Sequence, residues 1–538
     1  MTPPLNIVWF KRDLRIADHA ALNAACSNGG VLPLFVWEPT VWAGPDYATQ
    51  HAGFIAECLV ELKQQLQAIG LNLLESSLGI IEVLNSIKSQ RVIAAIYSHE
   101  ETGNSNTFAI DIAVAAWCKT HYVTWIELPQ NGVVRRLKSR NYWNGAWEKR
   151  MDAPQELLLQ QCLAAPQFNL PAANPIDFQG TDKPQRQQGG RSQGLVLLNS
   201  FLNGRAARYR GGISSPINAV TAGSRLSPYL AWGALSMREV VQASRMQQRK
   251  IAENPHQYPR GINAGLISFE SRLHWHCHFI QKLESEPSLE FENLHHAHDG
   301  MRNEHLADTD SQKRLATWCK GETGWPLVDA CMAMLRATGW INFRMRAMLM
   351  SIASYLYWLH WRETGLHLAR EFLDYEPGIH WSQSQMQSGT TGINTLRIYN
   401  PIKQAMDQDP EGKFVRHWLP SLKNVPTTWI FQPWLMPASL QLQYGCVIER
   451  DYPAPLVNIE QALREARSKI SSARSAKDHR QGYQLEAASI IKKHASRKGM
   501  LGGIRDVNGN EIKRKKLSKK TKETSQNNVI SIAQHELF

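Results

Sequence analysis

The sequence predicts an α/β N-terminal domain with a doubly wound parallel sheet, followed by an all-α domain. Two observations support this fold class. Short β-rich runs alternate with longer helical patterns through residues 5–128, as in a parallel sheet covered on both faces. Helical periodicity dominates from residue 193 to about 435. At 538 residues the chain also exceeds what one hydrophobic core usually supports.

Five apolar runs predict the strands of the α/β domain. They are "NIVWF", "VLPLFVW", "LNLLES", "VIAAIYS" and "YVTWIEL". Asp18 is expected to cap the helix that follows the first strand, and Gly70 to close the helix over 51–70. Parallel sheets bind ligands at the carboxyl ends of their strands, where "KRDLR", "EPTVWAGP" and "SHEETGN" lie.

The later segments complete the predicted organisation. We expect the α/β domain over 1–135, a linker over 136–192, the helical domain over 193–436, a helical extension over 437–500 and a basic disordered tail over 501–538. Within the helical domain, Ser236 and Glu239 form a capping-box pattern. A further helix should start near Pro326 and end before Gly339, and the extension should hold a helix near 458–472.

Composition excludes several classes of protein. No apolar run is long enough to cross a membrane and no signal peptide is evident, so we expect a cytoplasmic protein. The eight cysteines form no C-x-x-C pair, which argues for reduced, mostly buried thiols rather than a disulfide framework. The net charge of +13 favours a polyanionic partner, most simply nucleic acid.

The histidine-rich stretch "HWHCH" (274–278) is interpreted as part of a helix. Alternating histidines converge on one side only in a strand, and the surrounding residues have helical spacing. We therefore expect no metal site here, with metal binding as the minority alternative.

Two segments suggest anion or charge chemistry. In "SRLSPYLAWGALS" (224–236), Ser224, Arg225 and Ser227 precede a helix start, which fits either an anion site or plain capping. In "NFRMRAML", Arg344 and Arg346 lie about 200° apart on a helix, so one of them should point inward. An inward arginine needs a carboxylate, for which Asp374 and Glu376 are the candidates; a purely structural ion pair is the alternative.

Several motifs together resemble the photolyase/cryptochrome family. They are "WFKRDLRIADHAAL", "SRLSPYLAWGALS", "TGWPLVDACMAMLRATGWINFRMR", "WLHWRETG", "LDYEPGIH" and "RIYNPIKQ", in family order from about residue 5 to 436. The resemblance implies an α/β antenna domain and a helical domain that holds FAD in a U-shaped conformation. It also implies a second antenna chromophore of the folate or deazaflavin type.

The resemblance further implies roles for individual residues. The FAD phosphates and ribityl chain would contact Tyr209, Gly223, Ser224, Arg225, Leu226 and Ser227. The flavin ring and its cavity would be surrounded by Trp340, Arg346, Asp374, Glu376 and His380. Trp361 and Trp381 would carry electrons. DNA would contact Trp275, which stacks on the substrate, together with His276 and Arg344.

The chain departs from the family pattern at the substrate pocket. Arg272 stands where the family has a substrate-recognising glutamate, and a guanidinium only donates hydrogen bonds. Ala347 replaces a methionine of the pocket, and Gln385 lies near the place of a second stacking tryptophan. Phe343 and Ala347 occupy the places of the histidine pair of the (6-4) branch. The outer tryptophan of the electron chain aligns near Asp308, so an exit through Trp318, Trp325 or Trp358 is an alternative.

The last residues form a separate motif. Gln534, Leu537 and Phe538 resemble the peptide by which bacterial repair proteins bind the sliding clamp, although His535 replaces the usual leucine. Apolar side chains at the end of a basic tether could fill a pocket on that partner.

Three functions follow as hypotheses. The first is an FAD-dependent, light-driven lyase that splits UV-induced pyrimidine dimers in DNA. The second is a cryptochrome-type blue-light photoreceptor without repair activity. The third is a nucleic-acid-binding flavoprotein without a light-driven role. We place repair slightly ahead of signalling, and expect a monomer.

Overall fold

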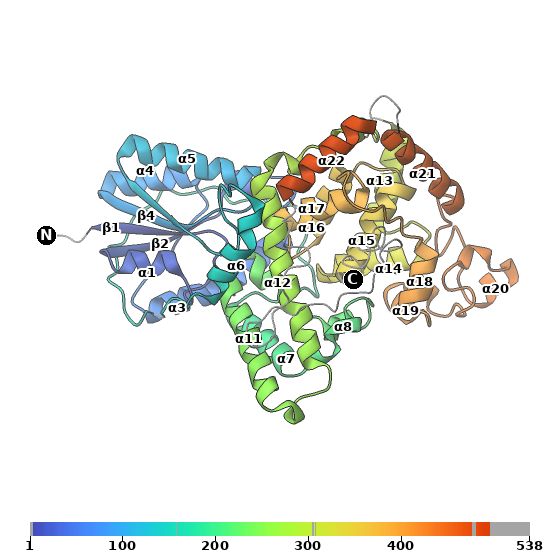
Figure 1. Cartoon of the computed structure of the whole chain (residues 1–538), viewed down its shortest axis with the longest axis horizontal. Coiled ribbons are helices and arrows are strands. Elements are labelled where there is room, and N and C mark those ends of the chain that lie inside the picture. The colour runs from blue at the N-terminus through green and yellow to red at the C-terminus, as the bar shows by residue number, and fades with distance from the viewer. Residues whose placement is uncertain (1–3, 158, 304–305, 307, 476–479, 495–538) are drawn as a thin grey trace, which may run out of the picture.

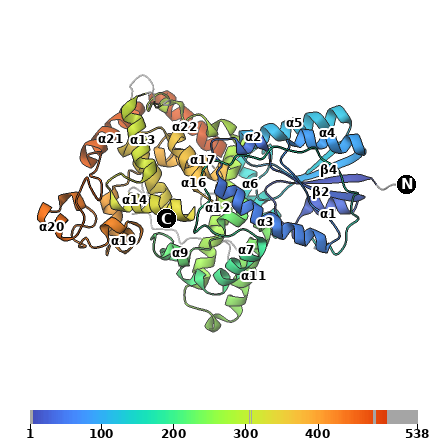
Figure 2. The same ribbon diagram turned by 180° about the vertical axis from the view of Figure 1, so that it is seen from behind.

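The computed structural model describes residues 4–157, 159–303, 306, 308–475 and 480–494. Figures 1 and 2 show the two expected units side by side, with the α/β domain at one end and the helical domain at the other. None of the described helices combines the length and the apolar run that a membrane crossing needs.

The sheet of the α/β domain confirms the five predicted strands. They are β1 (Leu5–Phe10), β2 (Gly30–Val36), β3 (Leu74–Ser76), β4 (Ile93–His99) and β5 (Thr124–Leu128). Their order is β3-β2-β1-β4-β5 and every pairing is parallel. β1 is therefore central, with Leu5 paired to Gly30 on one side and Ile93 on the other. Strand β3 is shorter than its apolar run.

Helices cover both faces of this sheet (Figure 1). They are α1 (Ala20–Cys26), α2 (Pro39–Trp42), α3 (Thr49–Ala68), α4 (Ile80–Gln90) and α5 (Ser105–His121). Helices α4 and α5 form one core with the sheet. Helices α1 and α3 contribute to a second core that continues into the helical domain, so the two units share buried apolar residues. Gly70 has φ of +84° just beyond α3, as expected for its C-terminus.

The predicted N-cap of α1 is wrong. His19 caps the helix, because its ring accepts a hydrogen bond from the Leu22 amide at 3.0 Å. The Asp18 carboxylate instead accepts a hydrogen bond from Ser236 at 2.6 Å and pairs with Arg238, both in the helical domain. Asp18 therefore forms an ion pair with a distant residue instead of capping α1.

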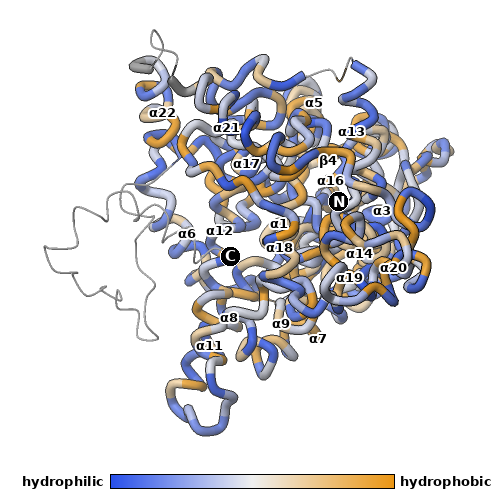
Figure 3. The backbone as a smooth tube through the Cα atoms, turned by 90° about the vertical axis from the view of Figure 1, so that its right-hand side faces the viewer, coloured by the Kyte–Doolittle hydropathy of each residue, from blue (hydrophilic) through white to orange (hydrophobic). Residues whose placement is uncertain are grey.

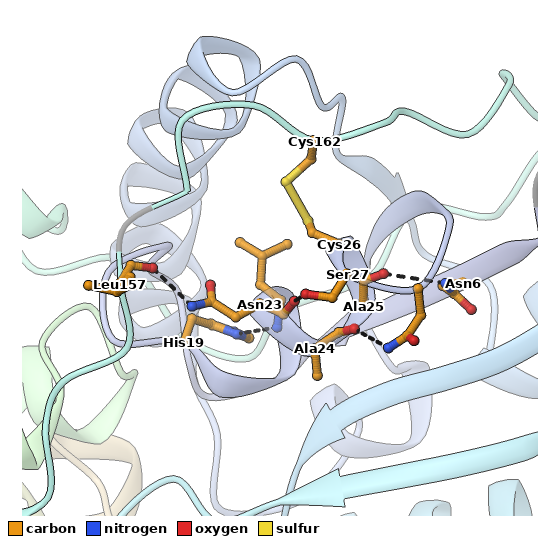
Figure 4. The surroundings of a disulfide bond; sticks show 11 residues. Asn6, His19, Asn23, Ala24, Ala25, Cys26, Ser27, Leu157 and Cys162 are labelled. Atoms are coloured by element: carbon orange, nitrogen blue, oxygen red, sulfur yellow. Dashed lines mark hydrogen bonds between the residues drawn. A yellow bond between two sulfur atoms is a disulfide. The ribbon is translucent and has the colours of Figure 1, made fainter.

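The expectation of eight reduced thiols is also wrong. Cys26, at the end of α1, forms a disulfide with Cys162 in the linker, 136 residues away, with the Cα atoms 5.6 Å apart (Figure 4). Sequence spacing gives no sign of this pair, because the two cysteines are brought together by contacts between distant segments. The linker backbone holds this position: Val31 donates to Leu163 at 2.8 Å, and Ala165 donates to Val31 at 2.9 Å. The other six cysteines are free, five of them buried.

The second unit is helical, as predicted. The linker contributes η1 (Arg140–Tyr142) and α6 (Trp143–Asp152). The helices that follow are α7 (Arg191–Asn203), α8 (Tyr209–Gly212), α9 (Ala219–Ala222), α10 (Ser227–Ala231), α11 (Met237–Glu253), α12 (Ile262–Ser285), α13 (Thr309–Lys320), α14 (Pro326–Thr338), α15 (Phe343–Ser351), α16 (Trp361–Glu371), α17 (Pro377–Ser388), α18 (Pro401–Gln408), α19 (Lys413–Trp418), α20 (Ala438–Gln443), α21 (Ile459–Ser475) and α22 (Arg480–His494). Shorter turns are η2 (Arg205–Arg208), η3 (Pro255–Gln257), η4 (Pro287–Glu290), η5 (His296–His298), the π-helical η6 (Ile352–Leu356), η7 (Pro420–Leu422) and η8 (Pro433–Leu435).

Local capping signals hold in this domain. Ser236 and Glu239 form the reciprocal capping box at the start of α11, with bonds of 2.6 and 2.9 Å. Pro326 begins α14, and Gly339 follows its end with φ of +66°. The hairpin between α11 and α12 projects away from both domains, and Figure 3 shows its tip to be hydrophilic.

The C-terminal part extends past the helical core. Helix α21 confirms the helix expected near 458–472. Helix α22 lies against α12 and η1 (Figure 1). The tail over 501–538 and its motif Gln534–Phe538 lie outside the described residues. The domain boundaries stay predictions.

Candidate functional site

The centre of the candidate site is an ion pair between α15 and the loop before α17. Arg346 donates to both carboxylate oxygens of Asp374, at 2.9 and 3.0 Å. Arg346 and the Ser227 hydroxyl lower the pKa of Asp374, although burial opposes this. The predicted inward arginine is therefore Arg346, and its partner is Asp374. Arg344 lies near Tyr399 and Arg397 instead, away from this pair.

Arg225, unlike Arg346, forms no ion pair with a carboxylate of the described residues. Its guanidinium lies 3.7 Å from the centre of the Trp340 ring, and its Nη1 atom is buried without a hydrogen-bond partner. Burial lowers the pKa of Arg225 to about 10. Its backbone has φ of +63°, a left-handed conformation that costs energy for a residue with a Cβ and is common at functional sites. Arg225 is thus a strained cation with an unfilled donor.

The segment around Arg225 holds the other predicted contacts. Tyr209 is buried at the start of α8, and Leu226 is buried beside Arg225. The carbonyls of Gly223 and Ser224 accept hydrogen bonds from Arg205, the latter at 3.2 Å. The predicted helix start at 227–228 is confirmed, although α10 is only five residues long.

Glu376 points toward the domain interface rather than toward Arg346. It pairs with Arg12, from the loop after β1, at 2.7 Å. Burial raises the pKa of Glu376 to about 7. Both residues, with His276, line a space of about 530 Å³, part of it open to solvent, between the two domains. Sequence analysis noted "KRDLR" at a strand end but did not identify Arg12 as the partner of Glu376.

Three aromatic residues form a contiguous buried group near the ion pair. The ring centres of Trp361 and Trp381 are 5.9 Å apart, and those of Trp381 and His380 are 4.8 Å apart. Gly365 permits this packing, because a Cβ there would lie 2.7 Å from Trp381. His380 Nε2 contacts the Gly365 carbonyl at 2.8 Å, and burial lowers the pKa of His380 to about 4. The imidazole is therefore neutral near pH 7.

The alternative exit tryptophans are packed elsewhere. The ring centres of Trp318 and His367 are 5.6 Å apart, and so are those of Trp325 and Tyr357. Trp358 is covered by Arg302 at 4.7 Å. Asp308, where the outer tryptophan aligns, caps α13 through the Ser311 amide.

Helix α12 places the predicted DNA-contacting residues on different sides. Trp275 is half-buried, with its ring centre 4.7 Å from His278 and 5.6 Å from Phe279. His276 faces the interdomain space. Arg272 is half-buried and lies near Tyr209. The structure thus does not bring Trp275 and His276 together, although they are adjacent in sequence.

The altered pocket positions have structural roles. Gln385 is fully buried and donates to the carbonyls of Leu289 and Glu292 at 2.9 and 2.7 Å. Its carbonyl accepts from the Leu294 amide at 2.7 Å. Gln385 therefore stabilises the backbone of residues 289–294 through hydrogen bonds. Ala347 is buried in the core, whereas Phe343 is partly exposed at the start of α15.

Buried polar atoms without partners mark where a ligand fits. Four of them gather from the elements around the Arg346–Asp374 pair, in addition to Arg225 Nη1: His276 Nδ1, Asn342 Oδ1, Trp381 Nε1 and Ser382 Oγ. Buried polar groups are normally hydrogen-bonded, so this set fits a large polar ligand. An unpaired arginine beside donors and acceptors suits a dinucleotide such as FAD, which offers anionic phosphates and a hydrogen-bonding ring.

Sequence analysis missed a buried cluster at the carboxyl end of the sheet. Asp13 accepts a hydrogen bond from His99 at 2.6 Å, and its Oδ2 lies 3.1 Å from His19 Nε2. Ligand atoms of the three lie within 4.8 Å of one another, as a metal would require. Asp13 Oδ1 also accepts from the Lys11 amide and His19 Nδ1 from the Leu22 amide, whereas His19 Nε2 has no hydrogen-bond partner. The histidines of 274–278, in contrast, are spread around α12, as helical spacing predicts.

A second space, of about 600 Å³ and partly open to solvent, lies at the ends of β1 and β2. Its lining includes six aromatic residues: Trp9, Phe10, Phe35, Trp42, Tyr47 and Trp232. Lys11 and Asp111, 3.1 Å apart, supply charge. Burial raises the pKa of Asp111 to about 6. This space suits a planar, partly polar ligand.

Comparisons with known proteins agree with this architecture. The family model for DNA photolyase matches residues 6–140, and that for the FAD binding domain of DNA photolyase matches 269–472. Cryptochrome DASH of Synechocystis sp. is 26% identical over 87% of this chain and 98% of its own length. The deoxyribodipyrimidine photo-lyase of Salmonella typhimurium is 27% identical over 88% of this chain and 99% of its own. A bacterial class III photolyase from Agrobacterium tumefaciens has the same fold, with a TM-score of 0.76 at 23% identity over 88% and 98% of the two chains.

Relatives named photolyase and relatives named cryptochrome match over nearly the whole described chain, so this likeness assigns a family and a cofactor rather than one activity. The family models cover both domains, and the second one carries the FAD-binding function. The chain belongs to the photolyase/cryptochrome family of FAD-binding proteins.

Proposed function

We propose that FAD is held between α12, α15 and α17 by the residues that the family resemblance selected. Arg225, with Ser224 and Ser227 beside it, would bind the phosphates, because a guanidinium matches phosphate geometry. The Arg346–Asp374 pair would hydrogen-bond the ring, and Trp340 and His380 would enclose it. Glu376 would act through Arg12 and the domain interface, since its carboxylate points there.

We propose that the protein is a light-driven DNA-repair lyase acting on pyrimidine dimers. The observation that carries this proposal is Trp275, a half-buried indole on α12 with Arg272 one turn before it. An accessible indole provides a stacking surface for an extruded base. When bound and reduced, FAD supplies the light-excited electron that splits the dimer. The protein's part is to hold the lesion and exclude water.

A specific observation favours a second candidate, a blue-light photoreceptor. Trp361, Trp381 and His380 are in continuous ring contact and fully enclosed, an arrangement suited to moving electrons inside the protein without DNA. Arg272 in place of a carboxylate also weakens recognition of thymine. A nucleic-acid-binding flavoprotein without a light-driven role is the third alternative.

One experiment separates the three. Purified full-length protein with bound, reduced flavin is mixed with UV-damaged single- and double-stranded DNA and exposed to blue light. Loss of lesions only in light supports repair. Photoreduction of the flavin without loss of lesions favours the receptor, and neither change with retained DNA binding favours the third alternative. Undamaged DNA is the control.

A variant tests the substrate pocket. Arg272→Glu restores a hydrogen-bond acceptor beside Trp275, so binding of dimer-containing DNA should improve relative to undamaged DNA. Lys119→Gln, an exposed charge change on α5, is the matched control. Unchanged preference for damaged DNA would count against Arg272 as the substrate position.

Three further proposals rest on the same family assignment. The aromatic space near β1 and β2 would hold a second, antenna chromophore, detectable as an extra absorption band in the purified protein. The tip Gln534–Phe538 would bind a sliding clamp, and removing those five residues should abolish co-purification with it. The protein would be a monomer, which light scattering measures directly.

A further inference from the structure

The outer side of α12 carries two cations and two histidines next to η1 and α22, with Lys282 and His278 half-buried. Arg140 lies on η1, His278 and Lys282 on α12, and His494 at the end of α22. Arg140 is 5% exposed and His494 2% exposed. Helix α22 contacts both α12 and η1, and Figure 1 shows it lying beside α12. We call these four residues the α12–α22 cluster.

Arg140 uses only part of its donor set. Its Nη2 contacts His278 Nδ1 and donates to the His278 carbonyl at 3.3 Å. Its Nη1 is buried without a hydrogen-bond partner, and the guanidinium covers Trp143 at 4.2 Å. No carboxylate of the described residues lies within ion-pair distance of Arg140. Because His278 Nδ1 accepts from Arg140, the proton of His278 is on Nε2.

Lys282 is also a cation without a counterion. Its Nζ lies 5.3 Å from the centre of the Phe279 ring, and no described carboxylate pairs with it. The nearby Glu286 is taken by Lys493 and lies 3.8 Å from His494 Nε2. Burial, reinforced by Arg140, lowers the pKa of Lys282 to about 8. Burial lowers the pKa of Arg140 to about 9.

Several partly buried arginines elsewhere in the chain face carboxylates. Arg346 pairs with Asp374, Arg12 with Glu376, and Arg191 with Glu239. An enclosed cation without such a partner is costly, and the cost is relieved when an anion binds. Arg15 and Arg302 are as buried as Arg140 and also lack a carboxylate, but they donate to backbone carbonyls. The α12–α22 cluster differs because Arg140 Nη1 has no partner and Lys282 has no ion pair among the described residues.

We propose that the α12–α22 cluster is a binding site for a phosphate group. Arg140 offers a free planar donor, Lys282 an ammonium group, and His278 and His494 further ring nitrogens, a combination that suits an oxyanion of charge −1 to −2. Trp275 and Phe279 lie beside the cluster on the same helix, 5.6 Å apart, so a nucleic-acid strand is one source of the phosphate. Free phosphate is the other. The site itself stands without the light-driven function; only the nucleic-acid source rests on it.

The first test uses inorganic phosphate and the full-length flavoprotein. Its thermal unfolding temperature is measured in phosphate and in chloride at equal ionic strength. We expect phosphate to raise the unfolding temperature by at least about 2 °C, because it binds only the folded chain. Equal unfolding temperatures in the two salts would overturn the proposal.

Variants distinguish a binding site from a structural role. Lys282→Gln should unfold at a higher temperature than wild type in chloride, since it removes an unpaired enclosed charge, yet it should lose the gain in phosphate. Lys282→Arg, which keeps the charge, should retain part of that gain, and Lys119→Gln should behave like wild type. A Lys282→Gln protein that is less stable in chloride and still responds fully to phosphate would contradict the proposal.

A second arm identifies the source of the phosphate. Binding of a short single-stranded oligothymidylate is measured across salt concentrations for wild type and for Arg140→Gln. If the strand supplies the phosphate, the variant should bind about 10-fold more weakly and with a shallower salt dependence. Unchanged oligonucleotide binding, with the phosphate response lost, identifies free phosphate as the ligand. Unchanged behaviour of Arg140→Gln in both assays would overturn the site.

Discussion

Two regions of the helical domain treat buried cations in opposite ways. Around residues 374–376, Asp374 and Glu376 each face an arginine, Arg346 and Arg12 respectively. At the α12–α22 cluster, Arg140 and Lys282 face aromatic rings and a histidine but no described carboxylate. The first region has its charges balanced by the protein itself. The second has two cations, Arg140 and Lys282, without an ion-pair partner among the described residues.

The two carboxylates of the first region also differ from each other. Asp374 is held by a bidentate arginine within one domain, and its pKa is lowered. Glu376 is enclosed at the interface, and burial outweighs Arg12 to raise its pKa to about 7. Two acids separated by one residue thus differ in protonation because of where their partners lie. At Asp374 the arginine outweighs burial, whereas at Glu376 burial outweighs the arginine.

The largest effect is expected from breaking the balanced pair. Asp374→Asn leaves Arg346 enclosed without a counter-charge, which should destabilise the protein by about 3–5 kcal/mol and abolish flavin retention. Chemical denaturation and the flavin absorbance of purified protein measure both. Asp407→Asn, on an exposed ion pair of α18, is the control and should change stability little. Full flavin content in Asp374→Asn would contradict the proposed role.

Glu376 gives the next largest effect, through pH. Its folded-state pKa of about 7 exceeds the unfolded value of 4.5, so the folded protein retains a proton that the unfolded chain has lost between these values. The free energy of unfolding should therefore fall as pH rises from about 5 to 7. In Glu376→Gln this fall should be smaller by about 2 kcal/mol. Denaturation curves at a series of pH values provide the difference. Parallel profiles would show that Arg12 keeps Glu376 ionised throughout.

Arg225 shares a feature with each region. It lies near the Arg346–Asp374 ion pair, but its guanidinium packs on the ring of Trp340. Arg225→Lys keeps the charge but loses the planar donors, so FAD affinity should fall about 10-fold, or about 1.4 kcal/mol. Fluorescence titration of flavin-free protein with FAD measures this. Arg249→Lys, on an exposed turn of α11, serves as the control. Equal affinities would remove Arg225 from the proposed phosphate contacts.

The smallest effect concerns the unbalanced region at high pH. The pKa of Lys282 is about 8 in the folded protein and 10.5 in the unfolded chain, so the unfolded chain binds more protons between these values. Without phosphate, stability should rise by about 1 kcal/mol across this window, a value reduced for partial exposure. Lys282→Gln should lack this rise in denaturation measurements. A rise of equal size in the variant would assign the effect to other groups.

Local patterns predicted much of this structure. The five strands, the capping box of Ser236 and Glu239, and the end of α14 at Gly339 follow from neighbouring residues alone. Helical spacing also predicted that one of Arg344 and Arg346 points inward and needs a carboxylate, and the structure shows it to be Arg346. The family resemblance added the FAD-binding function, which spacing did not contain.

Features that depend on distant segments were missed. Asp18 forms an ion pair with Arg238, and Glu376 forms one with Arg12. Cys26 forms a disulfide with Cys162. Each partner is more than a hundred residues away. The unbalanced cluster was missed for the same reason, because Arg140, Lys282 and His494 come together only when α22 lies on α12. Sequence patterns describe what a residue needs but not which distant residue supplies it.

The bond between Cys26 and Cys162 closes a loop that contains four of the five strands. A single proteolytic cut within residues 27–161 would consequently leave the two fragments joined. On a denaturing gel, such nicked protein would migrate as one species until a thiol reagent separated it into two.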